Sequence, residues 1–123
     1  MKTGPPSYYI SLKEAVEDFL KEQGLTPMDV VRVMDEDREG IIESLRKRCV
    51  ISFKTERKLL ERLTSKQLNF LVFVIQTFYI INMGGIYKGL LIYPRREHVV
   101  SGQKVTEEGL RHILKALGLP DID

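Results

Sequence analysis

One uncharged apolar segment, Leu68 to Ile81, constrains the fold of this chain more than any other feature of its sequence. Thr64 and Gln67 precede it with the spacing of a capping box, in which each side chain accepts a hydrogen bond from a backbone N–H at the start of a helix. Gly84 and Gly85 follow it and suit a helix end. The segment therefore predicts a helix that is apolar on every side and has to be buried.

Three environments are candidates for burying this helix. A membrane span needs about 20 apolar residues, a length that residues 68–86 approach. Asn69, Gln76 and Asn82 interrupt these residues, and we expect no membrane partner. We favour a central helix that the other helices of the chain surround. The alternative is a partner protein or a second copy of the chain, because a small domain has difficulty covering every side of such a helix. The phenylalanines that this partner interface would use are Phe70, Phe73 and Phe78.

The rest of the chain predicts a mainly α fold with a small β-hairpin, made of five to six helices around the central apolar helix. Residues 86–93 are β-prone, and residues 98–100 return as a partner strand after a charged turn at 94–97. A shorter β-prone stretch is 49–53. The segments with apolar residues at helical spacing, besides the central one, are 11–23, 27–34, 38–48, 55–63 and 106–117.

Length and cysteine usage predict one cytoplasmic domain. The chain has 123 residues, 43% of them hydrophobic, which suffices for a core; we expect a single helical domain over 1–123 with a frayed N-terminus at 1–9. Cys49 is the single cysteine, so no intramolecular disulfide can form, as is typical of a reducing compartment. We expect Cys49 to be a small buried core residue.

No constellation of residues in this sequence indicates catalysis. His98 and His112 are far apart and have no Cys or His at metal-ligand spacing. The Gly84-Gly85 pair and Gly89 lack the spacing of a phosphate-binding loop. The run 35–37 has adjacent carboxylates where a calcium loop alternates them, so we interpret it as the start of the next helix. We therefore expect no enzyme activity, no cofactor, no metal ion and no small-molecule substrate.

Basic and acidic residues are unevenly distributed. From Ser11 to Glu43 there are four basic and ten acidic residues, and from Arg46 to Lys66 there are eight basic and two acidic. Such asymmetry marks either a nucleic-acid partner or two solvated faces. The candidate nucleic-acid-binding residues belong to this basic middle and to an arginine pair in the predicted turn. They are Arg46, Lys47, Arg48, Lys54, Arg57, Lys58, Arg62, Arg95 and Arg96.

Two stretches resemble parts of winged helix-turn-helix DNA-binding regulators. The first, LTPMDVVRVMDEDREGIIESLRKRCVIS, carries short helices joined by tight turns, and the second, LLIYPRREHVV, supplies the wing. The resemblance implies that helix 38–48 enters a major groove, so that Arg38 and the run Arg46 to Arg48 face DNA. It also implies that Arg95-Arg96 lies at the tip of the wing and contacts phosphates. Helix 55–63 is an equally good basic surface for phosphate contacts without base readout.

Two hypotheses for function follow. The first is a DNA-binding regulator that acts as a homodimer on duplex DNA, and it requires the basic middle and the arginine pair to share one face. The second is a protein–protein adaptor or assembly subunit that docks through the apolar helix. Tyrosines beside basic residues either stack on bases or pack half-buried in strands. Those concerned are Tyr8, Tyr9, Tyr87 and Tyr93.

Overall fold

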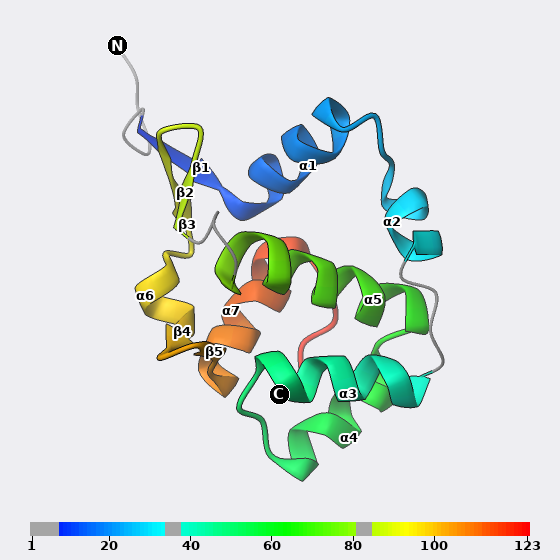
Figure 1. The fold of residues 1–123 in the computed structure, drawn as a ribbon. Helices are drawn as coiled ribbons and strands as arrows, with labels where there is room; N and C mark the ends of the chain where they lie inside the picture. The colour runs from blue at the N-terminus through cyan, green and yellow to red at the C-terminus, as the bar shows by residue number, and fades with distance from the viewer. Residues whose placement is uncertain (1–7, 34–37, 81–84) are drawn as a thin grey trace.

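The long apolar segment forms the central helix of the fold, as predicted. In the computed structural model, which describes residues 8–33, 38–80 and 85–123, it comprises α5 (Ser65–Val74) and a π-helical continuation, Ile75–Ile80 (Figure 1). The capping box is present: Thr64 Oγ1 accepts from the Gln67 N–H at 3.1 Å, and Gln67 Oε1 accepts from the Thr64 N–H at 2.9 Å. The side chains of this helix that are at most 1% exposed are Leu68, Leu71, Val72, Val74, Ile75, Phe78 and Tyr79.

The other predicted helices also form, with bounds within two residues of expectation. α4 begins two residues early because Ser52, whose Oγ accepts from the Thr55 N–H at 3.2 Å, is its N-cap. The sequence pattern does not predict the short helix α6. Residue 34 and the acidic run 35–37 lie outside the described residues. The helices besides α5 are α1 (Leu12–Glu22), α2 (Pro27–Val33), α3 (Arg38–Arg48), α4 (Phe53–Arg62), α6 (Arg96–Val99) and α7 (Glu107–Leu117).

The predicted hairpin between 86–93 and 98–100 is wrong, because residues 86–93 fold back on themselves. Lys88 and Gly89, with φ of 51° and 80°, form a tight turn between β2 (Ile86–Tyr87) and β3 (Leu90–Tyr93). β3 also pairs in parallel with β1 (Tyr9–Ser11), giving the order β1-β3-β2. The expected frayed end is thus wrong at Tyr9, and residues 1–7 lie outside the described part. A second hairpin pairs β4 (Val100–Ser101) with β5 (Lys104–Val105).

The second hairpin joins the C-terminal third of the chain to the loop after α3. The Val50 N–H donates to the Val105 carbonyl at 2.8 Å, and Cys49 forms an isolated parallel bridge with Val105. The predicted β-prone stretch 49–53 is reduced to this one bridge. Cys49 is buried, as expected, and burial raises the pKa of its thiol to about 12. The thiol is therefore protonated at neutral pH.

The partner interface predicted on the apolar helix is corrected at Phe78. Its side chain is fully buried, edge-on to the ring of Phe19 with 5.8 Å between centroids, so it packs in the core rather than on a partner. Phe70 and Phe73 are half-buried, with 6.3 Å between their ring centroids. Among the described residues, no helix has the length and apolar character that crossing a bilayer requires.

Glu107 connects the start of α7 to the start of α4, and we expect this contact to depend on pH. Its Oε2 accepts from the Ser52 N–H at 2.7 Å, and this bond holds the pKa of the carboxyl below its usual range. A carboxylate with a lowered pKa adds stability above its ordinary pKa, about 4.3, and loses it as the pH falls through the folded value. The free energy of unfolding should therefore drop in this acid window.

The Glu107→Gln variant should show a smaller acid-induced loss of stability than the parent protein in urea titrations between pH 3 and 7. The difference should be less than about 1 kcal/mol, because the carboxylate is open to solvent. The exposed neighbour Glu108 supplies the matched control, Glu108→Gln. Identical pH profiles for the Glu107 and Glu108 variants would contradict the assigned contact.

Candidate nucleic-acid interface

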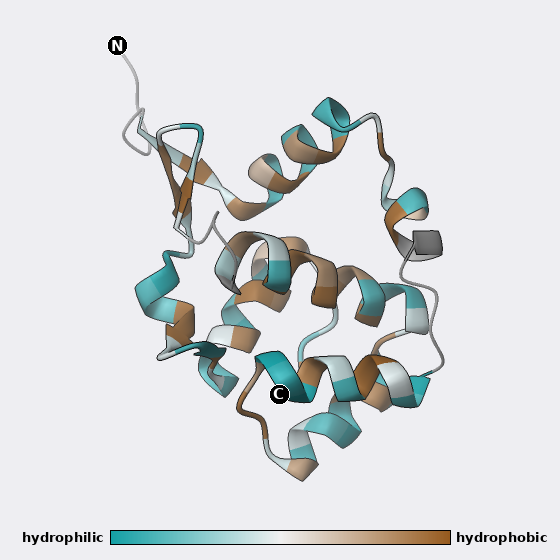
Figure 2. Ribbon diagram, in the orientation of Figure 1, coloured by the Kyte–Doolittle hydropathy of each residue, from teal (hydrophilic) through white to brown (hydrophobic). Residues whose placement is uncertain are grey.

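Five of the predicted basic residues flank the loop Cys49–Ser52, where α3 ends and α4 begins. On α4, the buried side chains lie on one side of the helix, and three basic residues lie on or beside the opposite, solvent-facing side. Figure 2 shows α4 mostly in the hydrophilic colour and the loop before it in the hydrophobic colour. We call the five residues the basic corner: Lys47, Arg48, Lys54, Arg57 and Lys58.

The lysines of the basic corner are available to an external anion. Within the described ranges, neither a hydrogen bond nor an ion pair engages Lys47, Lys54 or Lys58. Arg48 donates to the Ser44 carbonyl at 3.0 Å, a neutral acceptor that leaves its charge uncompensated. The Arg57 guanidinium carbon lies 5.8 Å from the ring centroid of Phe53. The corner therefore carries positive charge that no carboxylate in residues 8–33, 38–80 and 85–123 pairs with directly.

Arg46 belongs to an internal ion-pair network instead. It donates to both oxygens of Glu56, at 2.9 and 3.0 Å, and to Glu43 at 2.8 Å. These bonds raise the pKa of Arg46. Glu56 is 7% exposed, so the bidentate contact compensates an otherwise unpaired, nearly buried carboxylate. Arg46 therefore ties α3 to α4 and is not a free phosphate ligand.

Two further predicted residues also make internal contacts. Arg62 donates to the carbonyl of Asp121 at 3.0 Å and to that of Asp123, so it holds the C-terminal residues against α4. Arg38, expected to face DNA, donates to the Leu60 carbonyl and, at 3.2 Å, to the Leu63 carbonyl. It satisfies acceptors at the end of α4, where helical carbonyls lack partners. The expectation that Arg38 faces DNA is therefore corrected, because its guanidinium is bound to backbone carbonyls of this chain.

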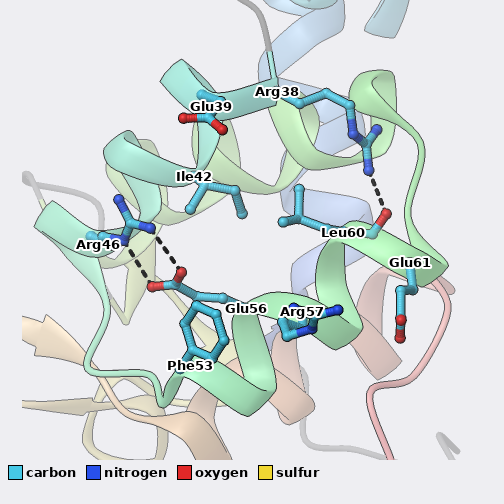
Figure 3. Close-up of a pocket in the computed structure, with 9 residues that line it drawn as sticks. All are labelled: Arg38, Glu39, Ile42, Arg46, Phe53, Glu56, Arg57, Leu60 and Glu61. Carbon is cyan, nitrogen blue, oxygen red and sulfur yellow. Dashed lines mark hydrogen bonds and ion pairs between the residues drawn. The ribbon is translucent and has the colours of Figure 1, made fainter.

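A pocket of about 470 Å³ between α3 and α4 is not an anion site (Figure 3). Ile42, Phe53 and Leu60 supply its apolar side chains. Its charged lining is mixed, since three arginines and three glutamates contribute and the Arg46–Glu56 pair closes one end. The residues with charged side chains are Arg38, Glu39, Arg46, Glu56, Arg57 and Glu61. The opposite charges in this lining offset one another, unlike the basic side chains on the solvent side of α4.

Arg95 and Arg96 lie at the start of α6 and not at a hairpin tip. Arg95 pairs with Glu97 at 2.8 Å, and Arg96 Nε donates to the Tyr79 carbonyl at 3.0 Å. α6 contacts β4, β4 pairs with β5, and β5 contacts α3. The arginine pair and the basic corner are thus joined through the β4–β5 hairpin along one side of the ribbon (Figure 1).

Sequence reasoning missed two features of this side. Lys104 Nζ donates to the Arg46 carbonyl at 3.4 Å, which adds a cation beside the end of α3. Val50 and Phe53 are 62% and 69% exposed. Gly102 before Lys104 signals a turn, but no sequence signal places that turn next to α3, because the contact joins residues 58 positions apart.

Comparison with protein-family models, with curated proteins and with solved structures returns no match. Across residues 8–33, 38–80 and 85–123, no group of three or more histidine, cysteine or carboxylate side chains is placed to hold a metal ion. Function therefore has to follow from the chemistry of these surfaces.

Proposed function

We propose that this protein binds nucleic acid through phosphate contacts at the basic corner. The observation that carries the proposal is the absence, among the described residues, of carboxylate partners for Lys47, Lys54 and Lys58. Lysines on a helix surface contact phosphates as mobile point charges, and release of the counterions condensed on the nucleic acid drives such binding.

Phosphate contact, rather than reading of base edges by α3, is the mode these residues favour. Arg38 and Arg46, which would read bases on a recognition helix, are bound to groups of this chain. The resemblance to winged helix-turn-helix regulators, with duplex DNA as ligand and a homodimer as the binding unit, stays a prediction. Phosphates are common to duplex and single-stranded ligands, so the proposal does not depend on that resemblance.

The triple variant Lys47→Gln, Lys54→Gln, Lys58→Gln should bind a fluorescein-labelled 20-base-pair DNA on the order of 100-fold more weakly than the parent protein near 0.1 M salt. Each lost phosphate contact on duplex DNA should lower the slope of log affinity against log salt by about 0.9. Fluorescence anisotropy at several salt concentrations measures both quantities.

The control is a triple variant with the same charge change on other helices, Lys13→Gln, Lys21→Gln, Lys115→Gln, which should bind like the parent. Absence of binding by the parent at low salt, or equal losses in the two triple variants, would contradict the proposal.

Assembly through α5 is the second candidate function, supported by the half-buried Phe70 and Phe73 rings. A partner would contact these two rings, because the other described apolar side chains of α5 are already buried within this chain.

A further inference from the structure

The three-stranded sheet has one buried and one exposed face. Ile92 is fully buried, whereas Tyr93, the next residue of β3, is 61% exposed. Alternate residues of a strand point to opposite faces, and directly paired residues of neighbouring strands point to the same face. The registers of β1 with β3 and of β2 with β3 therefore define an outer face. Its residues are Tyr9, Ser11, Ile86, Leu91 and Tyr93.

Aromatic rings gather at the β1 side of this outer face. The rings of Tyr8 and Tyr9 have centroids 4.9 Å apart, and His98 of α6 lies edge-on to Tyr93 at 6.4 Å. A hollow of about 520 Å³ opens between β1 and α6, a size typical of small-ligand sites. Tyr9, Tyr93, His98 and Arg95 are among the residues that line it.

A second hollow, of about 400 Å³, opens on the β2 side of the same face. Ile86, Leu91 and Gly102 contribute to its lining, and Arg95 borders both hollows. Gly102 lies in the turn of the β4–β5 hairpin, which continues to Lys104 beside the basic corner. The β4–β5 hairpin therefore connects the outer face, at Gly102, to the basic corner, at Lys104.

The size and chemistry of the outer face favour a strand of nucleotides over a protein. Its strands have three, two and four residues. At about 3.3 Å per residue and about 4.8 Å between strands, they cover on the order of 150 Å². A stable protein interface needs about 800 Å² per partner. Exposed tyrosine rings suit base stacking, since every base has a π-face. Arg95, which borders both hollows, is paired with Glu97 and adds no free charge, so the tyrosine rings alone favour nucleotides here.

We propose that the outer face stacks unpaired bases of a single-stranded nucleic acid whose phosphates follow the β4–β5 hairpin to the basic corner. The inference rests on the proposed function and adds a preference for unpaired nucleotides. Tyr93 is the central stacking residue because its ring is the most exposed on this face and lines the larger hollow.

The test measures anisotropy of the full chain with labelled 12-nucleotide oligo(U), oligo(dT) and a 12-base-pair duplex. Tyr93→Leu removes the ring and keeps an apolar side chain, whereas Tyr93→Phe keeps the ring. We expect Tyr93→Leu to weaken single-strand binding by about 5- to 100-fold. Tyr93→Phe should bind like the parent, and duplex binding should not change in either variant. A loss on one of the two single strands alone also supports the proposal and shows which of the two strands the outer face binds.

Equal binding of Tyr93→Leu and Tyr93→Phe, or an equal loss on duplex and single strand, would overturn this inference. If the lysine triple variant still loses affinity in that case, phosphate binding at the basic corner survives and only base stacking fails. Light scattering after gel filtration measures the oligomeric state of the parent and of Tyr93→Leu. A parent dimer that dissociates in Tyr93→Leu would show that the outer face is a protein interface and would overturn the inference. Thermal melts monitored by circular dichroism confirm that both variants fold.

Discussion

Replacing Gly109 with alanine is expected to destabilise the protein by about 3 kcal/mol or more, at the upper end of the range for overpacked cores. A Cβ on Gly109 would lie 2.2 Å from the Val99 carbonyl oxygen and 2.5 Å from the Val99 Cα. These atoms are backbone, so no side-chain rotation relieves the clash. The Thr106 N–H donates to the same carbonyl at 2.9 Å, which holds α7 against α6. Urea denaturation followed by circular dichroism measures the change.

The control for Gly109→Ala is His112→Ala, an exposed position one turn further along α7. This change should alter the free energy of unfolding by no more than about 0.5 kcal/mol. Because alanine favours helices over glycine by about 1 kcal/mol, an unstrained Gly109→Ala would be stabilising. A stabilised variant would therefore contradict the close approach of the two helices.

The second large effect is expected at Phe78, where alanine should cost about 3–5 kcal/mol, the range for a buried aromatic side chain. The ring is fully buried, and the centroid of Tyr87 lies 6.1 Å away on the side of the sheet. Removing it opens a cavity between α1, the π-helical turn and β2. The midpoint of urea unfolding, followed by circular dichroism, should fall by the corresponding amount.

Phe73→Asp distinguishes the core from an interface on the same helix. Phe73 is half-buried, so a charge there should disrupt an assembly, if α5 forms one, at a smaller cost in stability than Phe78→Ala. Gel filtration with light scattering and urea denaturation on both variants separate the two roles. Loss of assembly without loss of stability in Phe78→Ala would contradict the core position of that ring.

Local signals in the sequence predicted the helices well. The reciprocal Thr64–Gln67 cap and the apolar run after it act within a few residues, and both are present in the structure. The burial of Cys49 also follows from its apolar neighbours. The hairpin within residues 86–93 was not predicted, because a Lys-Gly turn is a weak hairpin signal. Lys88 also adopts a φ of 51°, which few non-glycine residues take. Ion pairs from Lys88 to Asp18 and Glu22 of α1 support that conformation.

The sequence predicted which residues of the candidate site are basic, but not where the fold places their side chains. The sequence places eight basic residues between Arg46 and Lys66, but it does not tell which of them the fold will use. Arg46 and Arg62 are bound by Glu56 and by C-terminal carbonyls, whereas Lys54 and Lys58 are not engaged within the described part of the chain. The planar guanidinium groups of Arg46 and Arg62 bind acceptors that are distant in the sequence and that only folding brings close.

By itself the sequence determined the helices other than α6, the identity of the central buried one and the charge asymmetry, because capping and apolar periodicity act over three or four residues. The tertiary structure decided which basic side chains pair with carboxylates among the described residues, and that β1 joins the sheet beside β3. It also placed Tyr9 and Tyr93, which are far apart in the sequence, on one outer face. Those outcomes depend on contacts between residues tens of positions apart, such as Tyr9 with Leu91, and local propensity carries no information about such pairs.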